Sequence, residues 1–178
     1  MFRRRVRPPI GRRVGELLWP SAGWKRRLRY LFLRLARLSG SPYSIAAGFA
    51  CGAAVSFTPF LGFHILLGVA FSWLLGGNPV AAMIGTLIGN PWTFPFIWWW
   101  TYWLGHQLLP GHQMIALKGV DVAYLTHHVW DILAPMALGG VLSATLVWFA
   151  SYYPVSRAIV VFRRNRASRR GGPRRPEA

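Results

Sequence analysis

The sequence contains an unbroken run of 80 residues, Leu38 to Leu117, that holds no Asp, Glu, Lys or Arg. About 25% of the residues in a soluble domain are charged, so a water-exposed run of this length would carry roughly 20 charges. A second uncharged run extends over 25 residues, from Ile132 to Ser156. Hydrocarbon is the solvent in which such surfaces are stable, and the two runs therefore predict an integral membrane protein.

The basic residues gather where the apolar runs end. Twelve of the 21 Lys and Arg lie in residues 1–37, eight lie in residues 157–175, and Lys118 is the remaining one. Arginine-rich tails bind nucleic acid in some proteins, but Lys and Arg that directly flank membrane segments usually stay in the cytoplasm. We therefore expect a multi-pass protein of the bacterial inner membrane with both termini cytoplasmic. Its expected partner is a lipid bilayer with anionic headgroups, and nucleic acid is not expected to bind.

Composition divides the chain into four segments. Residues 1–21 and 164–178 hold much Arg, Gly and Pro, and both are predicted to be disordered basic tails. Residues 22–39 predict an amphipathic helix in the membrane interface, because one face is apolar and the others are basic. That apolar face consists of Trp24, Leu28, Leu31, Leu35 and Leu38. Residues 40–163 are the predicted membrane domain.

Proline and glycine interrupt the long apolar run and divide it into short helices. Four are predicted, at residues 44–56, 61–75, 80–89 and 96–109, and the break prolines are Pro59, Pro91 and Pro95. Each helix falls short of the about 20 residues that cross a hydrocarbon core. Each broken pair is therefore either one kinked span or a re-entrant hairpin. Residues 132–153 are predicted to be a full span.

Two cytoplasmic termini require an even number of crossings. Residues 132–153 supply one, so the broken helices must supply an odd number. We expect residues 44–75 to cross once and residues 79–109 to enter and leave on the periplasmic side, while three crossings would also satisfy the count. The loop 110–131 carries one Lys against two Asp and is expected in the periplasm. The expected fold class is all-α, with Pro-broken helices that are kinked or re-entrant, a C-terminal span and a basic amphipathic N-terminal helix.

Four glycines are placed for close helix packing. Gly48 and Gly52 precede the first break, and Gly85 and Gly89 precede the second at an offset of 36 or 37 residues. A spacing of four puts each pair on one helix face, where the absence of a side chain lets two backbones approach closely. The offset indicates either an internal structural repeat or a chance similarity between two Gly- and Ala-rich helices.

Polar side chains near the two breaks form a candidate polar centre: Thr58, His64, Asn90 and Thr93. Paired broken helices mark the binding sites of many transporters, and ionisable groups at membrane depth are often functional. On this interpretation His64 binds a phosphate or relays a proton. The alternative is local: Asn and Thr cap the broken backbone, and His64 bonds a carbonyl that the break has freed.

The segments Ser56-Phe57-Thr58-Pro59-Phe60 and Gly89-Asn90-Pro91-Trp92-Thr93-Phe94-Pro95-Phe96 carry a family likeness. Over roughly residues 25–155 the chain resembles the bacterial membrane family called "domain of unknown function 2062". The Gly-Asn-Pro-x-Thr-Phe-Pro segment is the most specific part of this likeness. The resemblance implies a small helical membrane protein of Gram-negative bacteria and carries over no catalytic residue, substrate or cofactor.

The sequence predicts no enzyme, cofactor site or metal site. The four acids lie outside the apolar run, the spacing of the five His matches no metal site, and Cys51 is expected to pack as a small hydrophobe. One functional hypothesis is transport or lipid handling through the two broken segments. The alternative is a non-transporting membrane scaffold that binds anionic lipid or a partner protein through its basic ends. Assembly into a homo-oligomer is left open.

Overall fold

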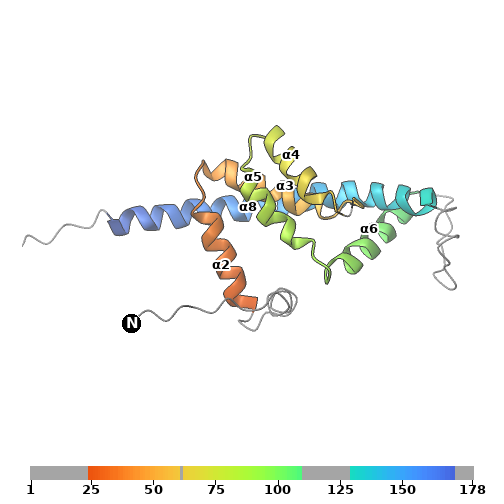
Figure 1. Cartoon of the computed structure of the whole chain (residues 1–178), viewed down its shortest axis with the longest axis horizontal. Helices are drawn as coiled ribbons and strands as arrows, with labels where there is room; N and C mark the ends of the chain where they lie inside the picture. Colours follow the sequence, from red (N-terminus) through yellow and green to blue (C-terminus); the bar gives the residue numbers. More distant parts are fainter. Residues whose placement is uncertain (1–23, 61, 110–128, 171–178) are drawn as a thin grey trace, which may run out of the picture. The chain divides into compact units, whose positions relative to one another are not determined.

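The computed structural model of the chain describes residues 24–60, 62–109 and 129–170. Every regular element in these segments is a helix, which confirms the predicted all-α class (Figure 1). The chain divides into two compact units, Met1–Arg37 and Leu38–Ala178.

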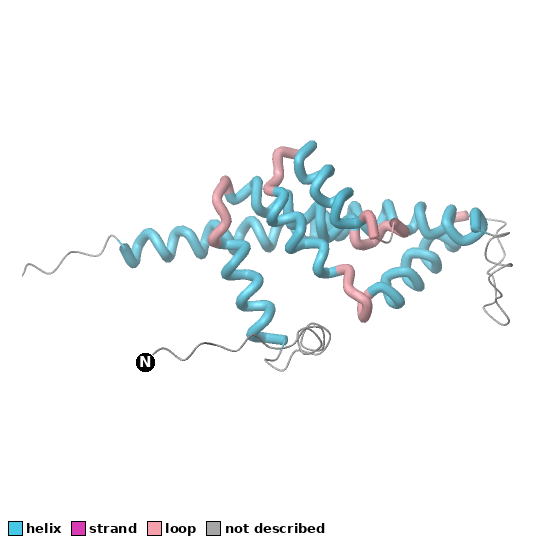
Figure 2. The backbone as a smooth tube through the Cα atoms, viewed as in Figure 1, coloured by secondary structure: helices cyan, strands magenta, loops and turns pink. Residues whose placement is uncertain are grey.

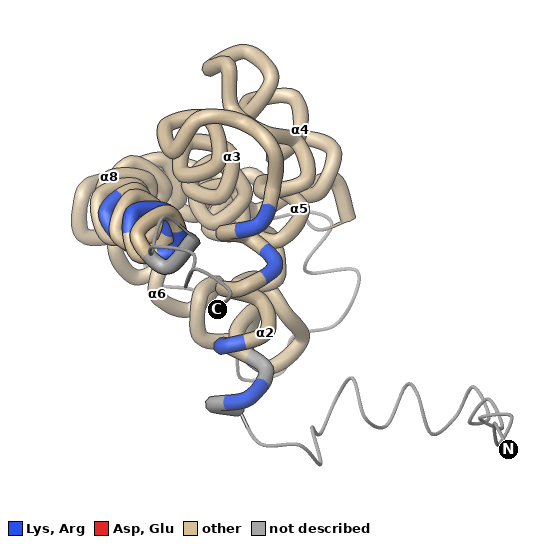
Figure 3. The backbone as a smooth tube through the Cα atoms, turned by 90° about the vertical axis from the view of Figure 1, so that its left-hand side faces the viewer, with Lys and Arg blue, Asp and Glu red and all other residues tan. Residues whose placement is uncertain are grey.

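The first unit contains helix α2, Trp24–Ala36. Its bounds lie inside the predicted helix 22–39, and an apolar stripe along one face accounts for its formation. The basic side chains Arg26, Arg29 and Arg34 are exposed. They appear as blue segments along α2 (Figure 3). The placement of this helix in the membrane interface stays a prediction.

The second unit is built around helix α3, Pro42–Val55. The hydroxyl of Ser41 accepts a hydrogen bond from the backbone N–H of Ser44 at 3.0 Å, so a side-chain cap and a proline in the first turn begin the helix. Ten of the 14 residues of α3 are buried, from Ile45 to Val55, and most of them are Ala or Gly. Small side chains allow several helices to surround this one at short range.

Helix α4, His64–Leu74, folds back along α3. At the open end of this hairpin the hydroxyl of Tyr43 donates to the carbonyl oxygen of Leu75 at 3.0 Å. The backbone N–H of Asn78 also donates to the carbonyl of Ser44 at 2.8 Å. Residues 41–78 therefore begin and end at the same level, and the first break is the tip of a hairpin.

The next two elements, α5 (Pro79–Gly85) and the 3-10 helix η1 (Thr86–Ile88), run parallel to α3. The side chain of Asn78 caps α5 by accepting hydrogen bonds from the first two free backbone N–H groups, at 2.9 and 3.1 Å. The chain then turns at the second break, which is drawn as a loop in Figure 2. The predicted helix 80–89 is thus observed, with its last turn tightened.

Helix α6, Phe94–Leu108, packs antiparallel on the N-terminal part of α8. Glycines at the crossing bring the backbones close: a Cβ added to Gly105 would overlap the carbonyl oxygen of Pro135. The indole N–H of Trp100 donates to the hydroxyl of Ser143 at 3.2 Å. Helix α3 also runs antiparallel to α8, since Cys51 lies beside Trp148 and Phe57 beside Gly140. Because α5 is parallel to α3, α5 and α6 point in the same direction, and residues 79–108 make one broken traverse.

Helix α8, Val129–Arg170, has 42 residues and is long and apolar enough to cross a membrane. Its uncharged run of 25 residues is about 38 Å long at 1.5 Å per residue, against a hydrocarbon core of about 30 Å. The helix is longer than the predicted 132–153, because Pro154 removes one backbone donor without ending it. Residues 164–170 are therefore helical, where a disordered tail was predicted. The loop expected at 110–131 lies outside the described residues up to position 128.

The hairpin is formed by the first broken pair and not by the second. Residues 79–109 were expected to form it, whereas hydrogen bonds close residues 41–78 into a hairpin and residues 79–108 run in one direction. Which of these segments cross the membrane stays a prediction. Helix α4 has 11 residues and a length of about 17 Å, too short to span the core. The turn through Gly76 (φ 65°) and Gly77 returns the chain to its starting level.

Many of the largest apolar side chains of the second unit lie on its surface. Buried positions are largely Ala, Gly and Ser, whereas the exposed positions include Trp73 (75% exposed), Trp130 (76%) and Leu146 (68%). A water-soluble protein rarely exposes apolar patches of this extent. The arrangement matches a protein whose outer surface faces lipid.

Candidate functional site

The first break is closed by its own side chains. The hydroxyl of Thr58 donates to the carbonyl oxygen of Val55 at 2.7 Å, and the hydroxyl of Ser56 donates to that of Gly52 at 3.0 Å. Ser56 is fully buried and also lies 3.5 Å from the carbonyl oxygen of Thr86. The carbonyls at the end of α3 are thus bonded within the protein, as the local interpretation of Thr58 requires.

The second break is closed more completely. The amide oxygen of Asn90 accepts from the backbone N–H groups of Trp92 and Thr93, at 2.9 and 3.1 Å. The hydroxyl of Thr93 donates to the carbonyl of Ile88 at 2.6 Å and accepts from the backbone N–H of Asn90 at 2.9 Å. Asn90 and Thr93 therefore bond to the backbone of residues 87–93, and their oxygen atoms face the break itself.

The two breaks lie beside each other, but they do not form an open polar centre. A Cβ added to Gly89 would lie 2.9 Å from the side chain of Ser56, and the ring of Phe94 packs edge-on against His64 with a centroid distance of 5.7 Å. The segments thus meet through Ser56, Gly89, His64 and Phe94. Asn90 and Thr93 bond to each other and to the backbone of their own break, and the Thr58 hydroxyl bonds to the backbone of the first break.

His64 is the exception among the predicted polar residues. Its Nδ1 atom is buried and makes no hydrogen bond within the part of the chain that the structure describes. The predicted bond to a freed carbonyl is therefore not seen among those residues. The Phe94 ring occupies one side of the imidazole, and no other ionisable side chain of the candidate centre stands beside it to relay a proton.

The predicted packing glycines bring α3 and α5 into backbone contact. A Cβ added to Gly48, Gly52 or Gly85 would lie within 2.5 Å of a backbone oxygen on the other helix. Gly89 instead packs against the Ser56 side chain. Helices α3 and α5 thus pack on each other, but the helices that follow them differ: α4 packs back along α3, whereas α6 packs on α8. The offset of 36 or 37 residues in the sequence therefore does not correspond to a structural repeat.

The break prolines have two different positions. Pro59 and Pro91 lie in the irregular segments between helices. Pro95 instead occupies the first turn of α6, where a missing backbone N–H costs no hydrogen bond. Pro95 was predicted as part of the break and in fact helps to begin the next helix.

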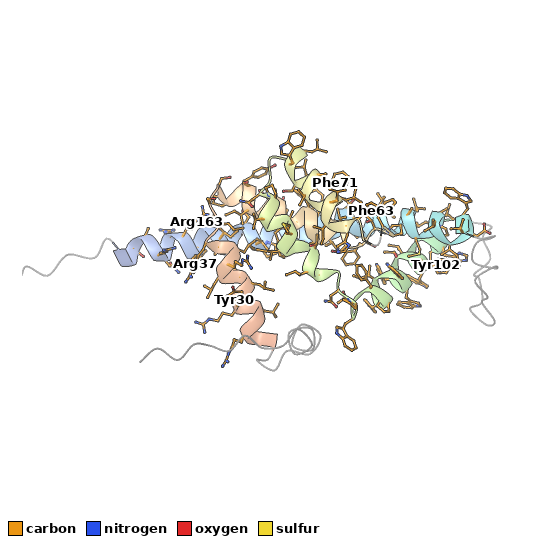
Figure 4. The ribbon with its side chains drawn as sticks, viewed as in Figure 1. Tyr30, Arg37, Phe63, Phe71, Tyr102 and Arg163 are labelled. Atoms are coloured by element: carbon orange, nitrogen blue, oxygen red, sulfur yellow. The ribbon has the colours of Figure 1, made fainter. Side chains whose placement is uncertain are left out.

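Arg163, which the sequence did not single out, joins α8 to the start of the hairpin. Its guanidinium donates to the carbonyl oxygen of Gly40 at 2.7 Å and to that of Leu38 at 2.8 Å. Figure 4 marks Arg163 on α8. Asn78 donates to the carbonyl of Ser39 at 3.1 Å from the other side. Both side chains therefore hold the backbone just before α3.

One family model matches the chain over residues 25–168, and its description is "Uncharacterized protein conserved in bacteria (DUF2062)". The match covers well over half of the chain, so the protein belongs to this family, as the sequence resemblance predicted. Neither the curated proteins nor the solved structures contained a match.

Proposed function

We propose that this family member is an inner-membrane protein that binds and organises lipid, and that it does not carry a polar solute between its broken helices. The observation behind this proposal is the closure of both breaks by their own side chains. A solute site at membrane depth needs polar groups that are free to exchange partners, and Thr58, Asn90 and Thr93 hold the broken backbone instead. The proposal assigns no catalytic role to any residue.

The proposed topology has two crossings and one re-entrant hairpin. The traverse 79–108 and helix α8 cross the bilayer, and the hairpin 41–78 enters and leaves from the side of the α8 C-terminus. Arg157, Arg163, Arg164 and Arg166 mark that side as cytoplasmic by the positive-inside rule. Asp131, at the other end of the uncharged run, would face the periplasm. Both termini are then cytoplasmic, and the hairpin lies in the inner leaflet.

Water access at the second break tests the proposal. Pro91→Cys, in a Cys51→Ala background, is exposed to a small charged thiol reagent in intact membranes and in inverted vesicles. We expect position 91 to stay unlabelled from either side, because side-chain hydrogen bonds close the break. Labelling at the rate of a cytoplasmic control, Arg164→Cys, would overturn the lipid proposal in favour of transport.

The scaffold hypothesis is the second candidate, and the exposed end of α8 favours it. Arg157, Arg164 and Arg166 are exposed, and the only acid of that helix is Asp131 at its opposite end. A basic helix end of this kind suits an anionic surface or an acidic partner. Replacing the three Arg with Gln separates the candidates: a scaffold loses its partner, whereas lipid binding within the membrane domain persists.

A further inference from the structure

A groove with a volume of about 540 Å³ lies between α3, α4 and α8. Its floor is formed by small or buried side chains of α3, including Cys51 and Val55, which are 2% and 5% exposed. The rim includes Phe71 of α4 and Val141 of α8, which are 49% and 61% exposed. Phe71 is marked on α4 in Figure 4. A buried floor with an exposed rim describes a groove that is open along one side.

The polar side-chain atoms of the groove are all bonded within the protein. Tyr43 donates to Leu75, Thr58 to Val55 and Thr145 to Val141, each through a side-chain hydroxyl to a backbone carbonyl. The indole N–H of Trp148 lies 3.4 Å from the Cys51 sulfur. Each of these hydroxyls has already given its only hydrogen to a backbone carbonyl, so a water in the groove would find hydroxyl oxygens that accept but no free hydroxyl donor. The chemistry of the lining therefore fits a hydrocarbon chain.

The groove runs in the direction of a lipid tail in the cytoplasmic leaflet. Tyr43 and Leu75, at the open end of the hairpin, lie at one end of it, and Thr58 and Val141, near the hairpin tip, lie at the other. The open end is the end toward the basic part of α8. In the proposed topology the groove thus extends from the inner membrane surface toward the middle of the bilayer.

The charge above the groove is positive. Arg163 is bonded near the start of α3 and uses two of its five N–H donors in the bonds to Leu38 and Gly40, so further donors stay available for a phosphate oxygen. Arg157 and Arg164 are exposed on the same part of α8. No acid lies between Asp131 and the end of α8 to balance them.

From these observations we infer that the groove holds one acyl chain of an anionic phospholipid of the cytoplasmic leaflet, with its phosphate near Arg163. The inference rests on the proposed lipid-binding function and specifies its ligand. An apolar partner helix is the alternative occupant. It would leave the basic residues at the open end of the groove without a counter-charge, whereas an anionic headgroup supplies one to Arg163 and its neighbours.

Hydrocarbon already surrounds the protein, so moving a tail into the groove gains little from the hydrophobic effect. Discrimination between lipids must then come from the headgroup. The attraction between one basic residue and an anionic surface corresponds to about five-fold stronger binding of an anionic lipid than of a lipid without net charge. Phosphatidylglycerol should therefore exceed phosphatidylcholine at this site by at least that ratio.

The test uses the full chain in phosphatidylcholine vesicles that contain a phospholipid with a photoactivatable group on its acyl chain. Adducts are located by mass spectrometry after irradiation. We expect adducts on the groove walls of α3 and α8, at least five-fold more with the phosphatidylglycerol probe than with the phosphatidylcholine probe. Ala144→Trp fills the groove and should reduce these adducts at least five-fold. Ala150→Trp, the same change on α8 outside the groove lining, should leave them unchanged.

Val141→Trp at the exposed rim provides a second groove-filling variant and should cause the same loss. Adducts confined to other surfaces, or unchanged by both groove-filling variants, would overturn the acyl-chain site. Equal labelling by the phosphatidylglycerol and phosphatidylcholine probes would overturn the inference that the site prefers an anionic headgroup. Failure of the proposed function is recognised separately, by rapid thiol labelling at Pro91→Cys.

Discussion

The contact between α3 and α5 makes a quantitative prediction for Gly52→Ala. The Cβ of an alanine at position 52 would lie 2.0 Å from the carbonyl oxygen of Ala82. Real Cβ contacts stay above 3.0 Å, so the two helices must separate by about 1 Å. Gly68, on α4, faces the same region with more room: its added Cβ would lie 3.2 Å from the Thr86 methyl carbon and 3.3 Å from the Gly52 Cα.

The two substitutions should differ strongly in the free energy of unfolding. A separation of 1 Å removes up to about half of the dispersion attraction between contacting atoms, and overpacking typically costs about 1–3 kcal/mol. An alanine in a helix regains about 1 kcal/mol over glycine. Because the obstacle at position 52 is rigid backbone, we expect Gly52→Ala to destabilise by about 2 kcal/mol. Gly68→Ala should stay within about 0.5 kcal/mol of the wild type, since its neighbour needs to move only slightly.

Reversible unfolding in mixed detergent micelles measures both variants. Tryptophan fluorescence reports the unfolding transition. The slope of the unfolding free energy against denaturant concentration must be the same in wild type and variants for their free energies to be compared. Equal stabilities of Gly52→Ala and Gly68→Ala would refute the close approach of α3 and α5. So would a destabilisation by Gly68→Ala that exceeds that of Gly52→Ala.

Three further predictions concern side-chain hydrogen bonds. Arg163→Gln should lower the unfolding free energy by about 1–3 kcal/mol, because it loses the two charge-assisted bonds to Leu38 and Gly40. Arg164→Gln should change the unfolding free energy by less than about 0.5 kcal/mol, and a larger effect than that of Arg163→Gln would contradict the role of these two bonds. Thr93→Val should cost about 1–3 kcal/mol and Thr93→Ser much less, because only serine keeps the bonds that close the second break. A double-mutant cycle of Trp100→Phe and Ser143→Ala should give a coupling of about 0.5–1.5 kcal/mol, and zero coupling would exclude the α6–α8 bond.

Local chemistry in the sequence was sufficient to locate the helices. Pro59 and Pro91 lie between helices, and the predicted glycines Gly48, Gly52 and Gly85 do mediate close packing. These features depend on backbone donors and side-chain size, which a single sequence displays directly. The same is true of the charge distribution that predicted a membrane protein.

The pairing of the helices could not be predicted in the same way. Both broken pairs have a small-residue helix, a break and a bulky helix, so local patterns do not distinguish a hairpin from a traverse. The distinction depends on contacts far apart in the sequence: Gly68 returns to Gly52, whereas Gly105 approaches Pro135 on α8. The Gly105 and Gly139 positions were an available signal for α6–α8 packing, but their partners were not evident.

The candidate polar centre shows a similar limit. Thr58, Asn90 and Thr93 were placed correctly at the breaks, but their alternative roles differ only in where each hydroxyl or amide points. Side-chain direction follows from the geometry of the break, which spacing alone does not determine. The apolar groove was missed altogether, because its lining comes from three helices whose arrangement was not known.

The re-entrant hairpin is the central claim, and the side of the membrane that its open end faces tests it most directly. Leu74→Cys and Trp130→Cys are placed separately in a Cys51→Ala background, since Leu74 and Trp130 are 68% and 76% exposed. A membrane-impermeant maleimide is then applied to spheroplasts and to inverted vesicles. The hairpin predicts that Leu74→Cys reacts only in inverted vesicles, whereas Trp130→Cys reacts only in spheroplasts. Reaction of Leu74→Cys in spheroplasts would place that turn in the periplasm and contradict the hairpin.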